Sequence, residues 1–238
     1  MRILKKIETL LFPKKCPLCS QIIPFGETSC KNCQDKNGIF IPDDLCSRCN
    51  KSISNCICTK EEIAEIPYLT SVYYYGDGNV RKSLIEFKFR GNKSHAEFFG
   101  NKLAERIAIK FPTVDFDLVT FAPMSKKSLR QRGYNQSELL AKVVAKRLFI
   151  PCRNTIVKTK ETLSQHDLDF SGRQTNLVGS MVADKNTDIK GKTVLLVDDI
   201  KTTGATLREC VKTLKANGAK EVYCITVALV YIDDDLFT

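Results

Sequence analysis

Apolar runs alternate with amphipathic stretches over most of the chain after residue 68. Four short runs rich in branched or aromatic residues predict strands at 69–75, 117–122, 193–197 and 222–230. Apolar positions that recur every three to four residues predict helices at 80–89, 95–111, 137–149 and 207–217. Because strands and helices alternate, the pattern predicts an α/β fold with a mostly parallel sheet flanked by helices.

The predicted strand at 193–197 leads into a polar segment that we interpret as a phosphate site. Asp198 and Asp199 are expected to end the strand, and a short turn precedes the next helix. The N-terminus of a helix exposes unpaired N–H groups and a partial positive charge, which bind phosphate. The residues assigned to this phosphate cup are Thr202, Thr203, Gly204, Ala205 and Thr206.

The acid pair beside this cup can accept hydrogen bonds from sugar hydroxyls, so the segment suits a ribose 5-phosphate. It is not a Walker A loop, because no Gly-Lys-Ser/Thr follows a glycine-rich turn. The alternative is an ordinary strand and turn whose acids face water.

A second polar segment, at 123–136, is basic and lies between a predicted strand and a predicted helix. Guanidinium groups match phosphate oxygens, often through two hydrogen bonds. In α/β folds the ligand binds at the carboxyl ends of the strands, where this segment should lie. The candidate anion-binding residues are Ser125, Lys126, Arg130 and Arg132. A solvated basic loop is the alternative.

Eight of the eleven cysteines form four close pairs near the N-terminus: Cys16/Cys19, Cys30/Cys33, Cys46/Cys49 and Cys56/Cys58. Two pairs complete the tetrahedral thiolate site that Zn²⁺ prefers, so we predict two structural zinc ions. Consecutive pairing places the first four cysteines on one ion and the last four on the other. A cross-braced arrangement, the first pair with the third, is the alternative. Cys152, Cys210 and Cys224 lie in apolar contexts and are predicted to be core residues.

The chain of 238 residues suits a small module at 1–60 and a main domain at 61–238, with a linker at 61–67. The formal net charge is +10. Eight thiolates and two zinc ions reduce it to about +6, which suits polyphosphorylated substrates or nucleic acid, or simple solubility.

No apolar run is long enough to span a bilayer. The basic, apolar segment at 2–12 is too short for a signal peptide and is predicted to be a helix. This helix either packs on its own domain or lies on a membrane surface. A cytoplasmic location is therefore expected, and there paired cysteines favour metal over disulfides.

Two resemblances extend this interpretation. The segment at 194–206 resembles the phosphoribosyl pyrophosphate (PRPP) motif of type I phosphoribosyltransferases. Nearly the whole chain resembles the ComF/ComFC family of bacterial competence proteins. The shared motifs are the cysteine pairs, Tyr75-Gly76, Arg81, Lys88 with Gly91, Arg132-Gly133-Tyr134-Asn135-Gln136, the series Thr162, Gln165, Leu168, Arg173 and Asn176, and Asp198 to Thr206. The sequence departs from the family at Ala122-Pro123-Met124, where Pro-Val-Pro is usual, and at Met181, where Phe is usual.

The resemblance implies a type I phosphoribosyltransferase fold behind a double zinc ribbon. It implies that 202–206 bind the 5-phosphate of PRPP and that Asp198 and Asp199 bind the ribose hydroxyls, with Mg²⁺ on the ligand. Ser125, Lys126, Arg130 and Arg132 would bind the pyrophosphate. The polar stretch at 158–176 would form a lid that includes Thr162, Gln165, Arg173 and Asn176.

The family also implies a role in DNA uptake during natural transformation. Its implied partners are single-stranded DNA and other DNA-uptake proteins, such as a helicase, at the cytoplasmic face of the inner membrane.

Three functions follow as hypotheses. In an enzyme that transfers a pentosyl group, Asp198 and Asp199 would favour positive charge on the ribose while Arg130 and Arg132 neutralise the leaving pyrophosphate. No acceptor is visible in the sequence.

A non-catalytic module would instead bind single-stranded DNA and use the PRPP site for ligand sensing. Candidate stacking residues for it are Tyr73, Tyr74, Tyr75 and Tyr134, although the first three lie in a predicted strand whose alternate rings face one surface. An adaptor that docks proteins through its zinc ribbons leaves the acid pair unexplained.

Overall fold

A computed structural model describes residues 13–24, 26–36, 41, 44–76, 78–91, 93–159 and 179–230. The predicted helix at 2–12 and the lid residues Thr162, Gln165, Arg173 and Asn176 lie outside these residues. Over the described part of the chain, no helix is long and apolar enough to cross a membrane.

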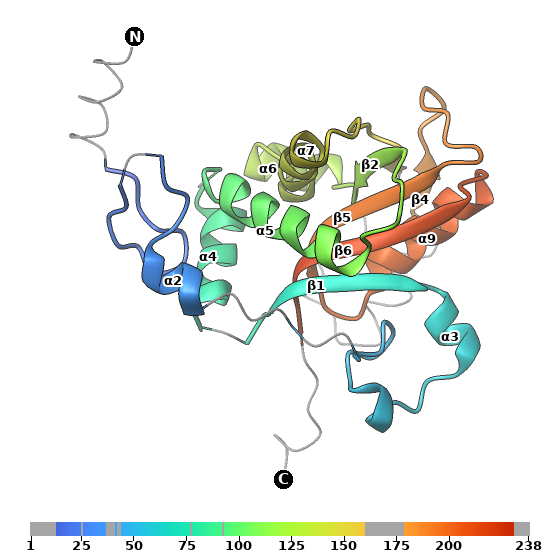
Figure 1. Cartoon of the computed structure of the whole chain (residues 1–238). Helices are drawn as coiled ribbons and strands as arrows, with labels where there is room; N and C mark the ends of the chain where they lie inside the picture. The colour runs from blue at the N-terminus through green and yellow to red at the C-terminus, as the bar shows by residue number, and fades with distance from the viewer. Residues whose placement is uncertain are drawn as a thin grey trace.

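A four-stranded parallel sheet forms the centre of the main domain (Figure 1). Its strands are β1 (Tyr68–Tyr74), β2 (Leu118–Phe121), β5 (Thr193–Lys201) and β6 (Glu221–Leu229), in the order β1-β6-β5-β2. All four were predicted as strands from the apolar runs. The predicted end of β5 is wrong, because the strand continues through the acid pair to Lys201, which pairs with Leu229. The acids therefore have the fixed backbone of a paired strand.

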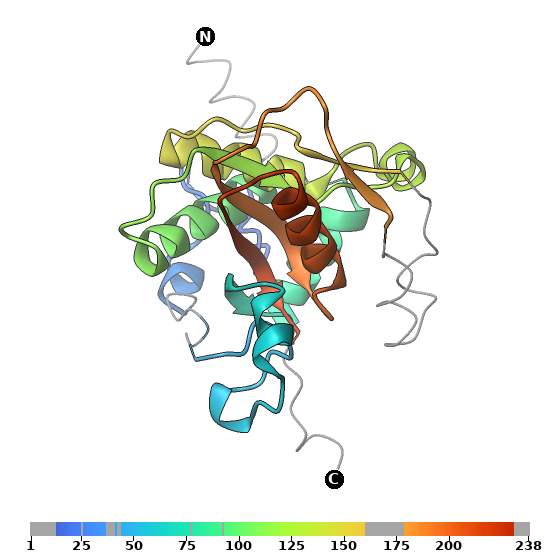
Figure 2. The ribbon, with the colours of Figure 1, turned by 90° about the vertical axis from the view of Figure 1, so that its right-hand side faces the viewer.

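Helices cover both faces of the sheet, as the alternating pattern predicted (Figures 1 and 2). On one face, α4 (Gly78–Phe89), α5 (His95–Lys110) and α7 (Gln136–Leu148) pack against Leu195 and Val197. On the other, α9 (Ala205–Ala216) packs against Val194 and Leu196. Successive residues of β5 thus enter opposite cores, which is why its sequence is a continuous apolar run.

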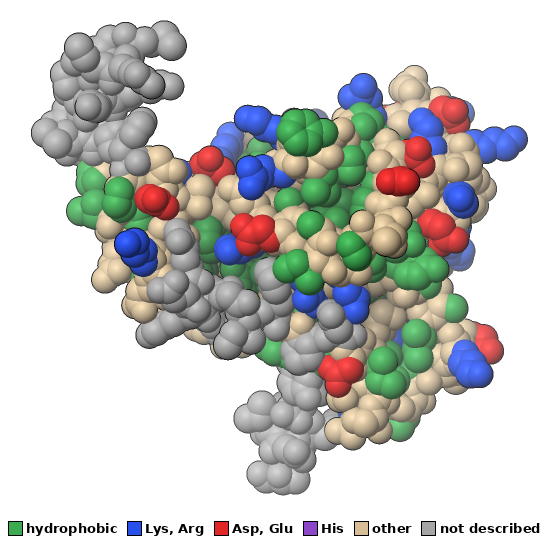
Figure 3. Space-filling model, in the orientation of Figure 1, with side chains coloured by type: hydrophobic (Ala, Val, Ile, Leu, Met, Phe, Trp, Pro, Cys, Tyr) green, Lys and Arg blue, Asp and Glu red, His purple; other side chains and the backbone are tan. Residues whose placement is uncertain are grey.

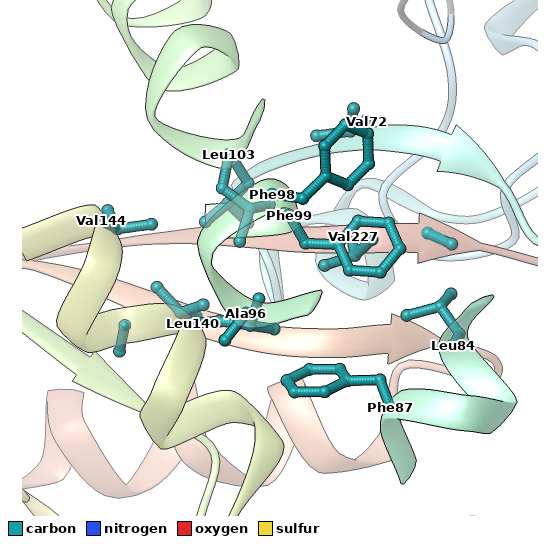
Figure 4. Packing of buried hydrophobic residues seen from close by; sticks show 14 of the residues in the cluster. Val72, Leu84, Phe87, Ala96, Phe98, Phe99, Leu103, Leu140, Val144 and Val227 are labelled. Carbon is teal, nitrogen blue, oxygen red and sulfur yellow. The ribbon is translucent and has the colours of Figure 1, made fainter. Parts of the chain in front are cut away.

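The larger core is built from aromatic and branched side chains of α4 and α5 against the sheet (Figure 4). Phe98 and Phe99 of α5 stand edge to face, with ring centroids 5.2 Å apart. Helix α5 approaches α7 closely at Gly100, where a Cβ atom would lie 2.5 Å from the Val143 Cβ. Glycine is required there because the neighbouring helix occupies the space of any side chain. Cys210 and Cys224 are buried as predicted, whereas Cys152 is half-buried.

Several short elements correct the sequence interpretation. The predicted linker begins with α3 (Lys60–Ala64), whose N-terminus carries a capping box between Thr59 and Glu62. The predicted basic loop contains α6 (Lys126–Arg132). A small antiparallel hairpin pairs β3 (Ile156–Lys158) with β4 (Met181–Ala183), so Lys158 belongs to a strand rather than to the lid. The remaining elements are α2 (Lys31–Lys36) and the 3-10 turn η1 (Ile53–Asn55).

Candidate functional site

The polar segments identified in the sequence meet at the carboxyl edge of the sheet. Strands β2 and β5 are neighbours, and Phe121 is in register with Val197. The Ala122 amide donates to the Val197 carbonyl at 3.0 Å, so the segment that leads to α6 leaves the sheet beside Asp198. Parallel pairing therefore brings the acid pair, the turn at 202–206 and the start of the basic segment to one edge.

Asp198 is a buried carboxylate, 9% exposed, that is held by α7. Its Oδ1 atom accepts from the Ser137 hydroxyl at 2.8 Å and from the Asp199 amide at 2.8 Å. Burial, and then the neighbouring Asp199 charge, raise the pKa of Asp198 to about 7. A carboxylate kept at such a cost suits a ligand that supplies further donors.

Asp199 has a different partner. Its Oδ2 atom lies 3.0 Å from the Lys88 ammonium, and both side chains are mostly buried. Lys88 is near the end of α4, and the same turn of helix is tied to the start of α7. The Gln136 side-chain amide donates to the Lys88 carbonyl at 3.2 Å, and the Tyr134 hydroxyl donates to the Phe87 carbonyl. The ion pair is thereby positioned by two helices.

The segment 134–136 therefore has a structural role at this edge. Asn135 caps α7 by accepting from the Ser137 amide at 3.0 Å, and its amide donates to the Ala122 carbonyl at 3.0 Å. Tyr134 is buried, with its ring 6.1 Å from that of Phe87. The expectation that Tyr134 could stack on bases is wrong, because its ring faces the core. Tyr73 is likewise buried.

The turn at 202–206 joins β5 to α9 in the way the phosphate-cup interpretation requires. Gly204 has φ of 74°, a left-handed conformation that glycine adopts without strain, and α9 begins at the next residue. The Thr203 hydroxyl accepts from the Ala205 amide at 3.3 Å. Arg208 donates to the Thr203 carbonyl at 2.7 Å and so holds the turn from outside. The roles assigned to Thr202, Thr206 and their neighbours stay predictions.

The candidate pyrophosphate residues lie on α6. Ser125 caps this helix by accepting from the Ser128 amide at 3.2 Å, so its hydroxyl is already engaged. Lys126 and Arg130 are exposed, and neither has an ion-pair partner within the described ranges. Arg132 is half-buried and lies over the ring of Phe89, 4.8 Å from its centroid. Phe89 itself is 54% exposed.

The eight paired cysteines form two clusters, and both fit zinc. Within each cluster the four Sγ atoms lie within 4.8 Å of one another. The Cys19–Cys30 and Cys49–Cys56 sulfur pairs are 3.5 and 3.7 Å apart, near the ~3.8 Å that a tetrahedron with Zn–S bonds of about 2.3 Å requires. The clusters follow consecutive pairing, Cys16 to Cys33 and Cys46 to Cys58, rather than the cross-braced alternative. Four thiolates in each cluster would hold a structural zinc ion that cross-links its loops.

The second cluster touches the candidate phosphate turn. Lys201, the last residue of β5, is 1% exposed and extends its side chain towards the turn after Cys49. Its ammonium donates to the Asn50 side-chain oxygen and, at 3.3 Å, to the Arg48 carbonyl. Burial, and then the nearby Arg208 charge, lower the pKa of Lys201 to about 8. No motif in the sequence pointed to this contact.

Comparison with known proteins agrees with both parts of the chain. A phosphoribosyl transferase domain model matches residues 135–234, and a double zinc ribbon domain model matches residues 7–65. The fold is therefore that of a type I phosphoribosyltransferase, with a parallel sheet flanked by helices, preceded by a double zinc ribbon. Both expectations about the fold class are confirmed. The boundary at 60/61 between the two parts stays a prediction.

Three characterised proteins illustrate the likeness. Competence protein ComFC of Bacillus subtilis is 30% identical over 149 residues, which cover 62% of this chain and 58% of that protein. Competence protein F of Haemophilus influenzae is 41% identical over 95 residues (39% and 41%), and DNA utilization protein YhgH of Escherichia coli K12 is 29% identical over 114 (46% and 48%). The chain spans about half the length of the curated relatives it matches. The two domain models and these relatives match the pattern of the ComF family that the sequence resembles.

Sequence reasoning missed the residues that position the acid pair and the turn after it. Lys88 and Asn135 were noticed as motif positions, but no role followed for either of them. Ser137 was noticed as the start of a helix, and Asn50 not at all. The available signal was the Asn-Gln-Ser run before an amphipathic helix, which is typical of an N-cap placed at a ligand edge.

Proposed function

We propose that the protein binds PRPP with Mg²⁺ at the carboxyl edge of the sheet and acts in DNA uptake. The observation that carries the ligand proposal is the acid pair next to the turn at 202–206. Asp198 and Asp199 are adjacent, mostly buried and fixed by Ser137 and Lys88, while a helix N-terminus begins a few residues later. The role in DNA uptake rests on the family and on the names of the competence relatives.

Each part of this edge would bind one part of the ligand. The amides and hydroxyls at 202–206 would hold the 5-phosphate, and the acid pair would accept from the ribose hydroxyls. Lys126, Arg130 and Arg132 of α6 would balance the charge of the pyrophosphate, and Mg²⁺ bound to the ligand would reduce the repulsion between its phosphates. If the protein transfers the pentosyl group, the same acids would favour positive charge on the sugar. The residues at 162–176 are proposed as a lid.

The ligand proposal is tested by the double substitution Asp198→Asn with Asp199→Asn. Loss of two charged acceptors should weaken Mg²⁺-PRPP binding by at least about tenfold, the scale of one hydrogen bond to a charged group. Inorganic phosphate, whose donors are at 202–206, should bind nearly as before. Both ligands are titrated calorimetrically into both proteins, with circular dichroism as the check on folding. Equal PRPP affinity in the two proteins would show that the acids do not touch the sugar.

A second candidate function is binding of single-stranded DNA without catalysis. On the face shown in Figure 3, basic and acidic side chains are intermixed, so net charge alone does not define a nucleic-acid surface. The favourable observation is local: exposed Phe89 lies beside Arg132 at the end of α6, which also presents Lys126, Lys127 and Arg130 to solvent. An exposed ring among cations suits base stacking next to phosphate contacts.

This candidate is tested with a fluorescent single strand at several salt concentrations. Replacing Lys126, Lys127, Arg130 and Arg132 with Ala should weaken binding and reduce its dependence on salt, because fewer counterions are released. Phe89→Ala should weaken binding by about fivefold or more without changing the salt dependence. Binding that neither change affects would exclude this surface. No binding at low salt would exclude direct contact with DNA.

A further inference from the structure

The two zinc ribbons contain the same turn. In the first, the Cys16 amide donates to the Gln21 carbonyl at 2.7 Å and the Ser20 amide to the Cys16 carbonyl at 2.9 Å. In the second, the Cys46 amide donates to the Lys51 carbonyl at 2.8 Å and the Asn50 amide to the Cys46 carbonyl at 3.0 Å. Ser20 and Asn50 both have positive φ, 62° and 66°. They are therefore equivalent positions, each next to a zinc-ligating cysteine.

The side chains at these equivalent positions differ. Ser20 is exposed, whereas Asn50 is 1% exposed. The Asn50 amide donates to the Val230 carbonyl at 2.6 Å, directly after β6, and to the Thr202 carbonyl at 3.4 Å, in the candidate phosphate turn. Its oxygen accepts from the Lys201 ammonium. One side chain of the second ribbon thus contacts the segments after both central strands.

Lys201 completes this contact from the other side. Its ammonium is bound by the Asn50 oxygen and the Arg48 carbonyl, and no carboxylate in the described segments lies within ion-pair distance of it. Its stem supports the turn: a Cβ atom on Gly204 would lie 3.1 Å from the Lys201 Cε atom. A buried ammonium without an acid is retained at a cost unless it is hydrogen-bonded, and here the ribbon supplies two acceptors.

A second connection between the second ribbon and the turn runs through charged side chains. Glu65, just after α3, accepts from Arg208 at 3.3 Å and lies 3.8 Å from Arg48 of the second ribbon. Arg208 in turn donates to the Thr203 carbonyl at 2.7 Å. The carbonyls of Thr202 and Thr203 are therefore both held by groups that the ribbon positions. Fixing these carbonyls fixes the peptide planes of the turn, and with them the directions of its amides.

We propose that Asn50 and Lys201 are positioning residues through which the second zinc ribbon shapes the phosphate-binding turn, whereas the first ribbon has no such role. The inference rests on the proposed function, because it assigns a cause to the affinity of 202–206 for a 5-phosphate. A turn whose amides already point at the phosphate binds it without an ordering cost. Zinc in the second site would hold the backbone from which Asn50 projects. The ribbon would thus be part of the ligand site without touching the ligand.

The test compares Asn50→Ser with Ser20→Ala in the zinc-loaded full chain. Serine occurs at the equivalent position of the first ribbon, so Asn50→Ser keeps a residue that tolerates this backbone while removing the contacts. Ribose 5-phosphate and Mg²⁺-PRPP are titrated calorimetrically, well below the unfolding temperature, and zinc content is measured for each protein. Asn50→Ser should weaken both ligands by about tenfold, and Ser20→Ala should leave both within about twofold.

A second variant keeps the test valid if Asn50→Ser does not fold. Lys201→Met keeps the buried stem and removes the ammonium, and should weaken the same ligands by about fivefold. Because Asn50 and Lys201 act through one contact, the double variant should bind no more weakly than Asn50→Ser alone. Additive losses of ligand affinity would show that the two residues act independently and would overturn the positioning role.

The remaining outcomes separate this inference from the proposed function. Wild-type affinity in Asn50→Ser and Lys201→Met, with the wild type binding both ligands, would overturn the inference alone. Failure of the wild type to bind either ligand would overturn both.

Discussion

The two zinc ribbons share a metal site and a turn but support different parts of the molecule. The first, with Cys16, Leu18, Ile23 and Cys33, belongs to the same buried cluster as Phe98 of α5. The second places Asn50 against Lys201, the last residue of β5, and Val230, directly after β6. Figure 1 shows the two ribbons, in blue and in cyan, on different sides of the main domain. Two ribbons with the same turn thus contact different parts of the main domain. The first packs on the larger core, and the second contacts the candidate ligand turn.

The largest expected effect comes from removing one zinc ligand in each ribbon. Cys49→Ser and Cys19→Ser should each reduce the zinc content from about two ions to about one. Cys49→Ser should also weaken ribose 5-phosphate binding by at least about thirtyfold, because the turn loses its Asn50 contact and Lys201 loses both Asn50 and Arg48. Cys19→Ser should change this affinity by less than about twofold. Metal analysis and calorimetry on the same samples give both numbers.

Equal loss of ligand affinity in the two cysteine variants would remove the distinction between the ribbons. It would mean that both zinc sites affect the ligand site alike. Thermal unfolding of both variants is the control, and the titrations are made where each is fully folded.

A second effect concerns pH and is confined to the ligand edge. The pKa of Asp198 is raised to about 7 in the folded protein, from about 3.8 for a free side chain, so the folded state keeps a proton that the unfolded chain loses. Stability should therefore fall as pH rises from about 4 to about 7, and Asp198→Asn should remove this part of the pH dependence. Affinity for Mg²⁺-PRPP should rise severalfold through the same range, because the ionised acid is the better acceptor.

Urea unfolding and ligand titration at pH 5, 6, 7 and 8 measure these dependences. Ser20→Ala, in the first ribbon, keeps all eight cysteines, is the matched control and should keep the wild-type pH profile. A profile in Asp198→Asn identical to that of the wild type would show that Asp198 does not titrate in this range.

The smallest expected effect lies at the first ribbon. Lys14 and Glu97 form an ion pair of 3.2 Å between this ribbon and α5, and both side chains are exposed. Such pairs contribute little, so Lys14→Ala should change the free energy of unfolding by at most about 0.5 kcal/mol and leave ligand affinity unchanged. Denaturant unfolding at low salt measures it. A loss above about 1 kcal/mol would show that the first ribbon is held more by charge than by its buried apolar residues.

The sequence predicted the sheet, its main helices and the cysteine clusters because each has a local signal. Apolar runs identify strands such as 193–197, and repeated Cys-x-x-Cys pairs identify tetrahedral sites. The α6 helix was missed because its seven residues bury no apolar face, so the segment has no amphipathic pattern. The hairpin of β3 and β4 was missed because its three-residue strands lie on either side of a long polar stretch.

The residues proposed to touch the ligand were identified in the sequence, whereas those that support them were missed. Asp198, Asp199 and the turn at 202–206 form a continuous motif, so one segment carries the signal. Asn50 and Lys201 are 151 residues apart, and nothing in a single sequence relates them. Lys201 in particular follows the acid pair and would be expected to face the ligand. Its burial against the ribbon follows from the extension of β5, which carries Lys201 past the acid pair to Asn50 and Arg48.

We infer that the second ribbon, and not the first, belongs to the ligand site. Hydrogen exchange of the zinc-loaded wild type with and without Mg²⁺-PRPP tests it most directly, because it reports on all three segments in one sample. The ligand should slow exchange at 202–207 and at 46–52 and leave 16–22 unchanged. Protection at 202–207 with neither ribbon affected, or with both affected equally, would contradict it.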